Sequence, residues 1–226
     1  EIKGSFLEDN ITDLSLWPNK EKLFYFTNST QNTFGNLFST KDSKKTIVFR
    51  SPFSEWLSQT ISTSTIGLTT KPSSEMYGYS YLLDTQTENY FKILGDIKGL
   101  TVLYAPNKQS LVFSNNDLNL NLFDIINKTT SPSGVKTLSE KCVWGANSLV
   151  LYCAVPKDFP SQNYPDAWYQ GIVSFDDVFW KIDLISQTST VLFDPEELGG
   201  EKTDGIKLSL DPAEHLLFFV NKKNGS

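Results

Sequence analysis

The hydrophobic and polar positions of this chain recur in short blocks that are typical of β-strands. Apolar runs alternate with polar turns, and one arrangement returns along the chain: a residue followed by Pro, a short polar turn, and an apolar strand. It occurs at Trp17–Pro18, Ala105–Pro106 and Asp211–Pro212, before the runs Leu23–Phe26, Leu111–Phe113 and Leu217–Val220. Because Pro presets the backbone of a tight turn, each of these segments predicts a β-hairpin.

A second arrangement follows each hairpin and completes a repeating unit. An apolar pair precedes Asp84, Asp124 and Asp183, and a polar turn and another strand come next. Two hairpins give four strands, and the units extend over residues 11–55, 56–96, 97–140, 141–202 and 203–226. Spacings of about 40 to 60 residues are typical of the four-stranded blades of a propeller.

Two of these units depart from the pattern. In the second unit, Trp56 and Ile66–Leu68 stand where the Pro turn is expected. In the fourth unit, the stretch Trp144–Val150 keeps the spacing from turn to strand, with Gly145–Asn147 in place of the Pro turn. We expect both units to form strands despite these differences.

The repeats predict an all-β fold, a β-propeller of four-stranded antiparallel blades that forms one domain, or a fragment of one, over residues 1–226. About four complete blades and a split terminal blade are expected. Glu1–Phe6 has the pattern of an outer strand of a preceding blade, and Asn224–Ser226 that of a turn before a third strand. The chain is then a partial propeller, a window from a longer one; the alternative is that its two ends share one blade.

The hairpins resemble the repeat of TolB-type and related WD-repeat-like propellers, in which Ser-Pro-Asp-Gly precedes an apolar strand. The segments that carry this resemblance are Trp17–Phe26, Tyr104–Phe113 and Leu210–Phe219. The run Lys141–Gly171 resembles an uncharacterised bacterial group of surface-anchored propeller proteins. Asp-Gly is missing from every turn of this chain. The resemblance implies a fold and a binding habit, not a reaction.

The composition favours β-strands over helices and argues against some classes of binding partner. Ser and Thr together occur 45 times and Ala only 5 times, which disfavours helix. The net charge of −6 argues against a nucleic-acid partner, and the basic run Lys41, Lys44 and Lys45 is typical of a solvated turn. No apolar run reaches the ~18 residues that cross a bilayer, so we expect no membrane insertion within this chain, while an anchor upstream stays open.

The sequence predicts no catalytic residues, no metal site and no cofactor. The single His, His215, lies in a turn, where it is a poor member of a Ser-His-Asp triad, and no nucleophile-elbow motif occurs. Two Cys and one His cannot complete a tetrahedral zinc site. Arg50 is the only Arg and no sialidase box is present, which argues against a sialidase propeller.

The two cysteines flank one hairpin. If its turn centres on Asn147–Ser148, Cys142 lies directly opposite Cys153, within reach of a cross-strand disulfide. Two free core thiols are the alternative. A disulfide would favour an extracytoplasmic location, at the bacterial cell surface or in the periplasm. Glycosylation sequons at Asn10, Asn28 and Asn127 are compatible with that location, and a chain rich in Asn and Thr also produces them by chance.

A long connection between the expected strands Leu149–Cys153 and Val178–Asp183 is the best candidate for binding. It spans about 24 residues and is rich in aromatic and acidic side chains, and long loops in compact domains are usually functional or disordered. The connection either folds back as a local core or exposes an aromatic surface with an acidic rim. The candidate binding residues are Phe159, Tyr164, Asp166, Trp168, Tyr169, Asp176 and Asp177.

Asp176 and Asp177 could hold a cation, but neighbours on a strand point to opposite faces, so ordinary solvation is favoured for both. We therefore expect a non-catalytic, extracytoplasmic interaction scaffold that binds a protein or glycan partner through loops at one face. A propeller module of a secretion or envelope complex would differ only in its partner. The alternative is the propeller domain of a glycoside- or peptide-cleaving hydrolase, whose carboxylate pair would come from residues such as Asp158 and Asp166.

Overall fold

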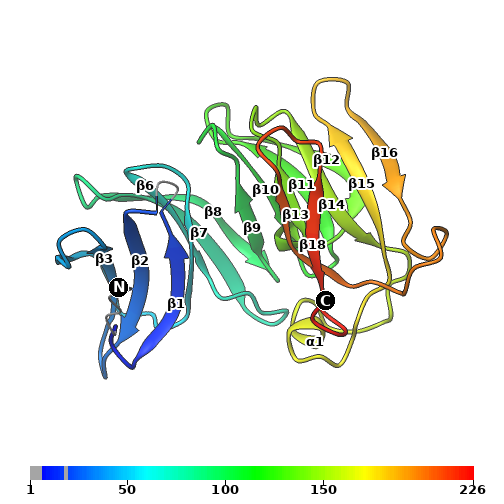
Figure 1. The fold of residues 1–226 in the computed structure, drawn as a ribbon. Helices are drawn as coiled ribbons and strands as arrows, with labels where there is room; N and C mark the ends of the chain where they lie inside the picture. Colours follow the sequence, from blue (N-terminus) through cyan, green and yellow to red (C-terminus); the bar gives the residue numbers. More distant parts are fainter. Residues whose placement is uncertain (1–6, 18–19) are drawn as a thin grey trace, which may run out of the picture. The chain divides into compact units, whose positions relative to one another are not determined.

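The structure is a computed structural model that describes residues 7–17 and 20–226, and nearly all of its regular structure is antiparallel β-sheet (Figure 1). The first two sheets contain β1 (Ile11–Leu16), β2 (Lys22–Asn28), β3 (Thr33–Ser39) and β4 (Lys45–Ser51), then β5 (Trp56–Thr60), β6 (Thr65–Thr70), β7 (Tyr77–Asp84) and β8 (Tyr90–Lys98). The third contains β9 (Thr101–Tyr104), β10 (Ser110–Ser114), β11 (Asn119–Asp124) and β12 (Thr129–Lys136). The fourth contains β13 (Cys142–Trp144), β14 (Val150–Pro156), β15 (Asp177–Asp183) and β16 (Thr188–Phe193).

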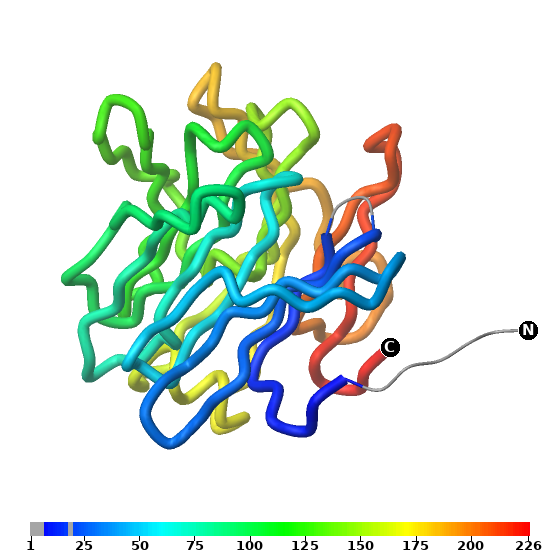
Figure 2. The backbone as a smooth tube through the Cα atoms, turned by 90° about the vertical axis from the view of Figure 1, so that its left-hand side faces the viewer, coloured from blue at the N-terminus to red at the C-terminus, as the bar shows by residue number. Residues whose placement is uncertain are grey.

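A last, two-stranded sheet pairs β17 (Gly205–Leu210) with β18 (Leu217–Asn221). The backbone passes up and down through one sheet before it enters the next, as the trace in Figure 2 shows. The predicted all-β fold of four-stranded antiparallel sheets is confirmed. Two short helical segments, η1 (Ser139–Lys141) and α1 (Asp166–Tyr169), were not predicted. None of the helices in the described segments is long and apolar enough to span a membrane.

The same type of turn joins the first two strands in four of the sheets, and it explains the repeat in the sequence. The amide of the fourth turn residue donates to the carbonyl of the first in the pairs Lys20–Trp17, Lys108–Ala105, Ser148–Gly145 and Glu214–Asp211. Each fourth residue has a positive φ, between 57° and 62°. A single left-handed residue of this kind closes the turn at a modest cost, which a hydrogen-bonded hairpin can offset.

The structure corrects the alignment of the fourth unit by one residue. Gly145, not Trp144, takes the place of Ala105, because its amide donates to the carbonyl of Val150 as that of Ala105 donates to Ser110. The first strand anchor is then Leu151 rather than Val150. The Pro18–Asn19 turn and the expected outer strand Glu1–Phe6 lie outside the described residues.

The chain divides into two compact units. Unit 1 comprises residues 1–71 and 80–94, and unit 2 comprises residues 72–79 and 95–226. In unit 1, aromatic side chains of β2 pack with Phe49 and Trp56, and Phe24 and Phe26 meet edge to face at 5.0 Å. Three consecutive residues of β2, from Phe24 to Phe26, are at most 1% exposed, so both faces of this strand are covered.

Unit 2 contains two cores on opposite faces of the fourth sheet. Towards the third sheet, Val112 and Leu120 pack against Trp144, whose indole Nε1 donates to the Leu103 carbonyl at 3.2 Å. Towards β17, the ring of Phe179 contacts those of Phe193 and Phe219, with centroids 4.5 Å away in each case. Complete burial of a phenylalanine side chain contributes about 1.5–3 kcal/mol, so these contacts hold the sheets of unit 2 together.

The predicted cysteine register is confirmed. Cys142 pairs with Cys153 and Trp144 with Leu151 across β13 and β14. The two cysteines form a disulfide, with their Cα atoms 4.0 Å apart, and the alternative of two free thiols is not what the structure has. Both residues are buried in the core between the third and fourth sheets.

Removal of this disulfide is expected to destabilise the folded chain by about 3 kcal/mol, the loop-closure value for its span. The paired variant Cys142→Ala/Cys153→Ala, compared with the oxidised wild type by urea unfolding, measures this loss. Reductant should lower the unfolding midpoint of the wild type and leave that of the variant unchanged. A wild-type midpoint that does not respond to reductant would mean that the two sulfurs are not bonded.

Candidate functional site

The long connection of the fourth sheet is shorter than its sequence suggested. β14 runs to Pro156 and β15 starts at Asp177, with these two residues paired, so the connection spans residues 157–176. We call residues 157–176 the insertion. It includes the one-turn helix α1, beyond one end of the strands of unit 2 (Figure 1).

The interior of the insertion is a small apolar core. Tyr164 and Trp168 are each 5% exposed. Together with Val173 and Phe175 they form a cluster with two leucines that flank strands of the third sheet, Leu118 before β11 and Leu138 after β12. The interpretation in which the insertion folds back as a local core therefore holds for these two aromatics. The expectation that Tyr164 and Trp168 form an exposed binding surface is wrong, because their rings cover apolar ends of the sheets instead.

Two of the expected aromatics do reach solvent. Phe159 is 40% exposed and contacts the edge of Phe175, and Tyr169 is 39% exposed. The Tyr169 hydroxyl donates to Glu140 Oε2 at 3.0 Å. The Asp166 carboxylate accepts a hydrogen bond from the Ser74 amide at 2.5 Å, so this acid fastens a neighbouring segment of unit 2 and is not a free rim charge.

A buried ion cluster fastens the insertion to the sheets. Lys141 Nζ is 2.8 Å from Asp177 Oδ2 and also contacts Asp204 Oδ1, and all three side chains are fully buried. Lys141 ends η1, Asp177 begins β15 and Asp204 directly precedes β17. Asp177 was expected to be solvated like Asp176, and this is wrong, because the inward face of β15 carries it into unit 2.

Asp204 connects this cluster to the insertion. Its Oδ2 accepts hydrogen bonds from Trp168 Nε1 at 2.9 Å, Ser174 Oγ at 3.1 Å and the Phe175 amide at 3.1 Å. Asp177 Oδ2 accepts from the Gly205 amide at 2.6 Å, but its Oδ1 is buried without a partner. Lys141 and Asp204 were not predicted as site residues, since each is an ordinary charged residue beside a strand in the sequence.

The pKa values of the two acids of the cluster are shifted in opposite directions. Burial raises the pKa of Asp177 to about 6, against the attraction of Lys141. Burial also opposes ionisation of Asp204, but Lys141 and the hydrogen bond from Trp168 outweigh it and lower the pKa. The difference follows from the hydrogen bonds, because Asp204 has several donors and Asp177 has one unpartnered oxygen.

Glu140 is a third acid at the same junction, and it is partly buried. Burial raises its pKa to about 7, while the hydrogen bond from Tyr169 and the charges of Lys141 and Lys222 act in the other direction. Its Oε1 is buried without a hydrogen-bond partner. Lys222 lies over the Trp168 ring, with Nζ 4.0 Å from the ring centroid, and donates to the Trp168 carbonyl.

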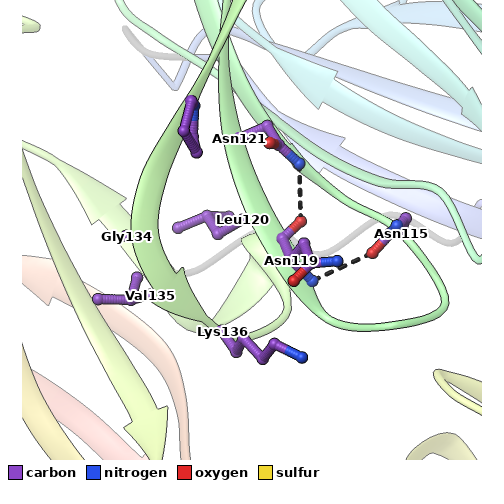
Figure 3. A pocket seen from close by; sticks show the side chains of 8 residues that line it. Asn115, Asn119, Leu120, Asn121, Gly134, Val135 and Lys136 are labelled. Atoms are coloured by element: carbon purple, nitrogen blue, oxygen red, sulfur yellow. Dashed lines mark hydrogen bonds between the residues drawn. The ribbon is translucent and has the colours of Figure 1, made fainter.

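An open groove lies beside the insertion, on the third sheet. Its first pocket, of about 430 Å³, occupies a bulge between β11 and β12 (Figure 3). Asn119 pairs with Lys136 and Asn121 with Pro132, so one residue of β11 faces three of β12. Gly134, with φ of 82°, lies in this bulge, where its lack of a side chain permits the left-handed backbone.

A second pocket, of about 340 Å³, continues the groove towards the insertion. The two pockets share Asn119 and Lys136, and the second is closed on its far side by Phe159, Pro160 and Tyr164. We call the two together the β11–β12 groove. Of the expected binding residues, the structure brings only Phe159 and Tyr164 to it. None of its amide residues was predicted, because the bulge that gathers them has no signal in the strand pattern.

The acidic candidates do not share a site. Asp177 is buried on Lys141, Asp166 binds the Ser74 amide, and Asp176 lies 3.5 Å from Lys202 Nζ. Across residues 7–17 and 20–226, no three His, Cys, Asp or Glu side chains are grouped as metal ligands would be. Each of these three carboxylates is therefore engaged by a different partner.

Comparison with known proteins identifies the fold and no family. No protein-family model and no curated protein matches the chain. The tricorn protease is similar with a TM-score of 0.64 at 10% identity, over 93% of this chain and 19% of that one. TolB from Acinetobacter baumannii is similar with a TM-score of 0.60 at 11% identity, over 92% of this chain and 47% of that one.

A chain of the nidogen/laminin complex is similar with a TM-score of 0.60 at 8% identity, over 94% of this chain and 72% of that one. This chain thus spans about half the length of TolB and about a fifth of the tricorn protease. With the four-stranded sheets, these likenesses show a β-propeller fold that resembles TolB-like proteins.

The variant Lys141→Met is expected to destabilise the chain by about 3–5 kcal/mol, because it leaves two buried carboxylates without a counter-ion. Lys157→Met is the matched control, since its partners Asp194 and Glu196 form a partly exposed network whose charges solvent screens. Urea unfolding of both variants measures the difference. Equal losses in the two variants would contradict the role of the buried cluster.

The variant Glu140→Gln is expected to match the wild type in stability at acidic pH and to exceed it above neutrality by about 2 kcal/mol. The pKa of Glu140 is raised in the folded state, so its favourable contribution is complete below the ordinary value of 4.5 and is lost as the pH rises through about 7. Gln imitates the protonated acid. Thermal unfolding from pH 4 to pH 9, with the exposed Glu197→Gln as control, measures the effect, and a pH-independent difference would contradict it.

Proposed function

We propose that this chain is a non-catalytic, extracytoplasmic propeller domain that binds a protein or glycan partner at the end of unit 2 where the insertion lies. The observation that carries the proposal is the β11–β12 groove, with the exposed Phe159 at its wall. Exposed aromatic side chains beside polar groups are typical of recognition surfaces, because they combine apolar area with orientation by hydrogen bonds.

The location rests on the disulfide. Cys142 and Cys153 are bonded within one hairpin, and such bonds persist in oxidising compartments and are rare in the cytosol. This supports an extracytoplasmic chain, at the cell surface or in the periplasm of a bacterium.

A scaffold role has support from one structural neighbour. The nidogen/laminin structure is by its title a complex of two proteins, so a chain of this fold class takes part in a protein assembly there. The tricorn protease is by its name an enzyme, but this chain matches only 19% of it. Within the insertion, Asp166 accepts from the Ser74 amide and Asp176 lies near Lys202, and this engagement of its acids favours the binding role over the hydrolase alternative.

The purified chain is expected to bind an oligosaccharide or peptide on printed arrays, with an affinity that Phe159→Ala lowers about tenfold. Truncation of an anchoring aromatic side chain costs about 1–2 kcal/mol at an interface. The matched control is Phe91→Ala on β8, since Phe91 is 64% exposed in unit 1. Titration of the array hits by calorimetry measures the affinities.

No ligand on either array, or equal losses in the two phenylalanine variants, would contradict the proposed binding surface. The array hits are also incubated with the chain and analysed by mass spectrometry. Cleavage of a bound ligand would favour the hydrolase alternative.

A further inference from the structure

The β11–β12 groove is lined by amide side chains whose hydrogen-bonding groups are only partly used. Asn115 Oδ1 accepts from the amide of Asp117 at 3.1 Å. It also accepts from the amide of Asn119 at 3.1 Å, and Asn121 Nδ2 donates to the Asn119 carbonyl at 2.9 Å (Figure 3). Within the described chain, no hydrogen bond engages Asn115 Nδ2, Asn121 Oδ1 or the side chain of Asn119. The amides are therefore oriented by the backbone and still offer both donors and acceptors.

The bulge interrupts the ladder of backbone hydrogen bonds beside these amide side chains. Because Ser133, Gly134 and Val135 turn away from β11, the ladder between Asn119 and Asn121 is interrupted. Ser133 Oγ donates to the Leu120 carbonyl at 2.8 Å, which satisfies the backbone group that the bulge would otherwise leave open. The opening is thus stable without a ligand, and its polar walls stay accessible.

The charged residues that line the groove indicate which classes of ligand fit it. Lys136 and Asp117 are the charged residues that line it, one of each sign. A phosphate or other anion calls for several cationic donors, and a divalent cation for several carboxylates. Neither set is present, and a purely apolar ligand would leave the amides without partners.

The far wall supplies a flat apolar surface. Phe159 and Pro160 of the insertion line the second pocket together with Asn116 of the β10–β11 loop and Asn119 at the start of β11. The negative face of an aromatic ring attracts C–H groups, and amides match hydroxyls because both kinds of group donate and accept. A sugar ring presents C–H groups on its faces and hydroxyls on its rim, so one ring can use both walls together.

We propose that the β11–β12 groove is a binding site for a neutral saccharide, held by the Asn119 and Asn121 amides and stacked against Phe159. The inference rests on the proposed binding function and names its ligand class. The combined volume of the two pockets, about 430 and 340 Å³, is in the range of sites that hold small ligands.

The test uses the full chain on a printed array of neutral oligosaccharides and on an array of peptides, with chitotriose and cellotriose titrated by ¹H–¹⁵N NMR. At least one neutral oligosaccharide is expected to bind and to shift the amide signals of Asn119, Asn121 and Lys136. The variant Asn119→Ala should weaken this binding about fivefold to tenfold, the effect of one or two lost hydrogen bonds. Phe159→Ala should weaken it to a similar extent.

Asn127→Ala is the matched control, because Asn127 lies in the turn at the opposite end of β11 and bonds only locally to Asp124. It should leave saccharide affinity unchanged, and thermal unfolding confirms that each variant is folded. Peptide binding that Asn119→Ala weakens, without saccharide binding, would overturn the saccharide assignment and leave the proposed binding function standing. Saccharide binding that maps outside the groove would also overturn the assignment, and failure of both arrays would overturn the assignment and the binding function together.

Discussion

The buried contact of Lys141 with Asp177 and Asp204 is the interaction on which the end of unit 2 that carries the insertion depends. It joins η1, the start of β15 and the approach to β17, and Asp204 extends it to Trp168 and Phe175 of the insertion. Burial of two carboxylates and one ammonium group away from water costs free energy unless their hydrogen bonds are satisfied. The insertion supplies donors to Asp204, so the charges and the insertion hold each other in place.

The groove follows from this arrangement. One wall belongs to the third sheet, where a bulge in β12 exposes amides of β11, and the other belongs to the insertion through Phe159 and Pro160. Phe159 contacts Phe175, whose amide is bonded to Asp204. The ion cluster is therefore linked through Phe175 to a groove residue that it does not touch.

Local signals in the sequence were sufficient for the sheets and the disulfide. The Pro turns predict hairpins because the same hydrogen-bonded turn closes at Ala105 and Asp211, and the hairpin register alone places Cys142 opposite Cys153. The assignment failed by one residue at Trp144, since a large aromatic residue there resembled Trp17 although the turn begins at Gly145. Sequence spacing could not decide this, because only the backbone hydrogen bonds distinguish the two alignments.

The site depended on long-range contacts that no local pattern reports. Lys141 is separated from Asp177 by 36 residues and from Asp204 by 63. The aromatic content of the insertion could not separate the buried Trp168 from the exposed Phe159. The amides of the groove were missed because a bulge arises from backbone geometry at Gly134 and not from an apolar and polar alternation.

Amide hydrogen exchange of the insertion tests most directly whether the ion cluster holds it against the sheets. The amides of Phe175, Val173 and Ile172 are bonded within the structure, to Asp204 Oδ2 and to the Ala167 carbonyl. We expect them to exchange as slowly as the amides of β14 in the wild type, and much faster than β14 when Lys141 is replaced by Met. Rapid exchange of these amides in the wild type, at the rate of an unstructured loop, would contradict the account.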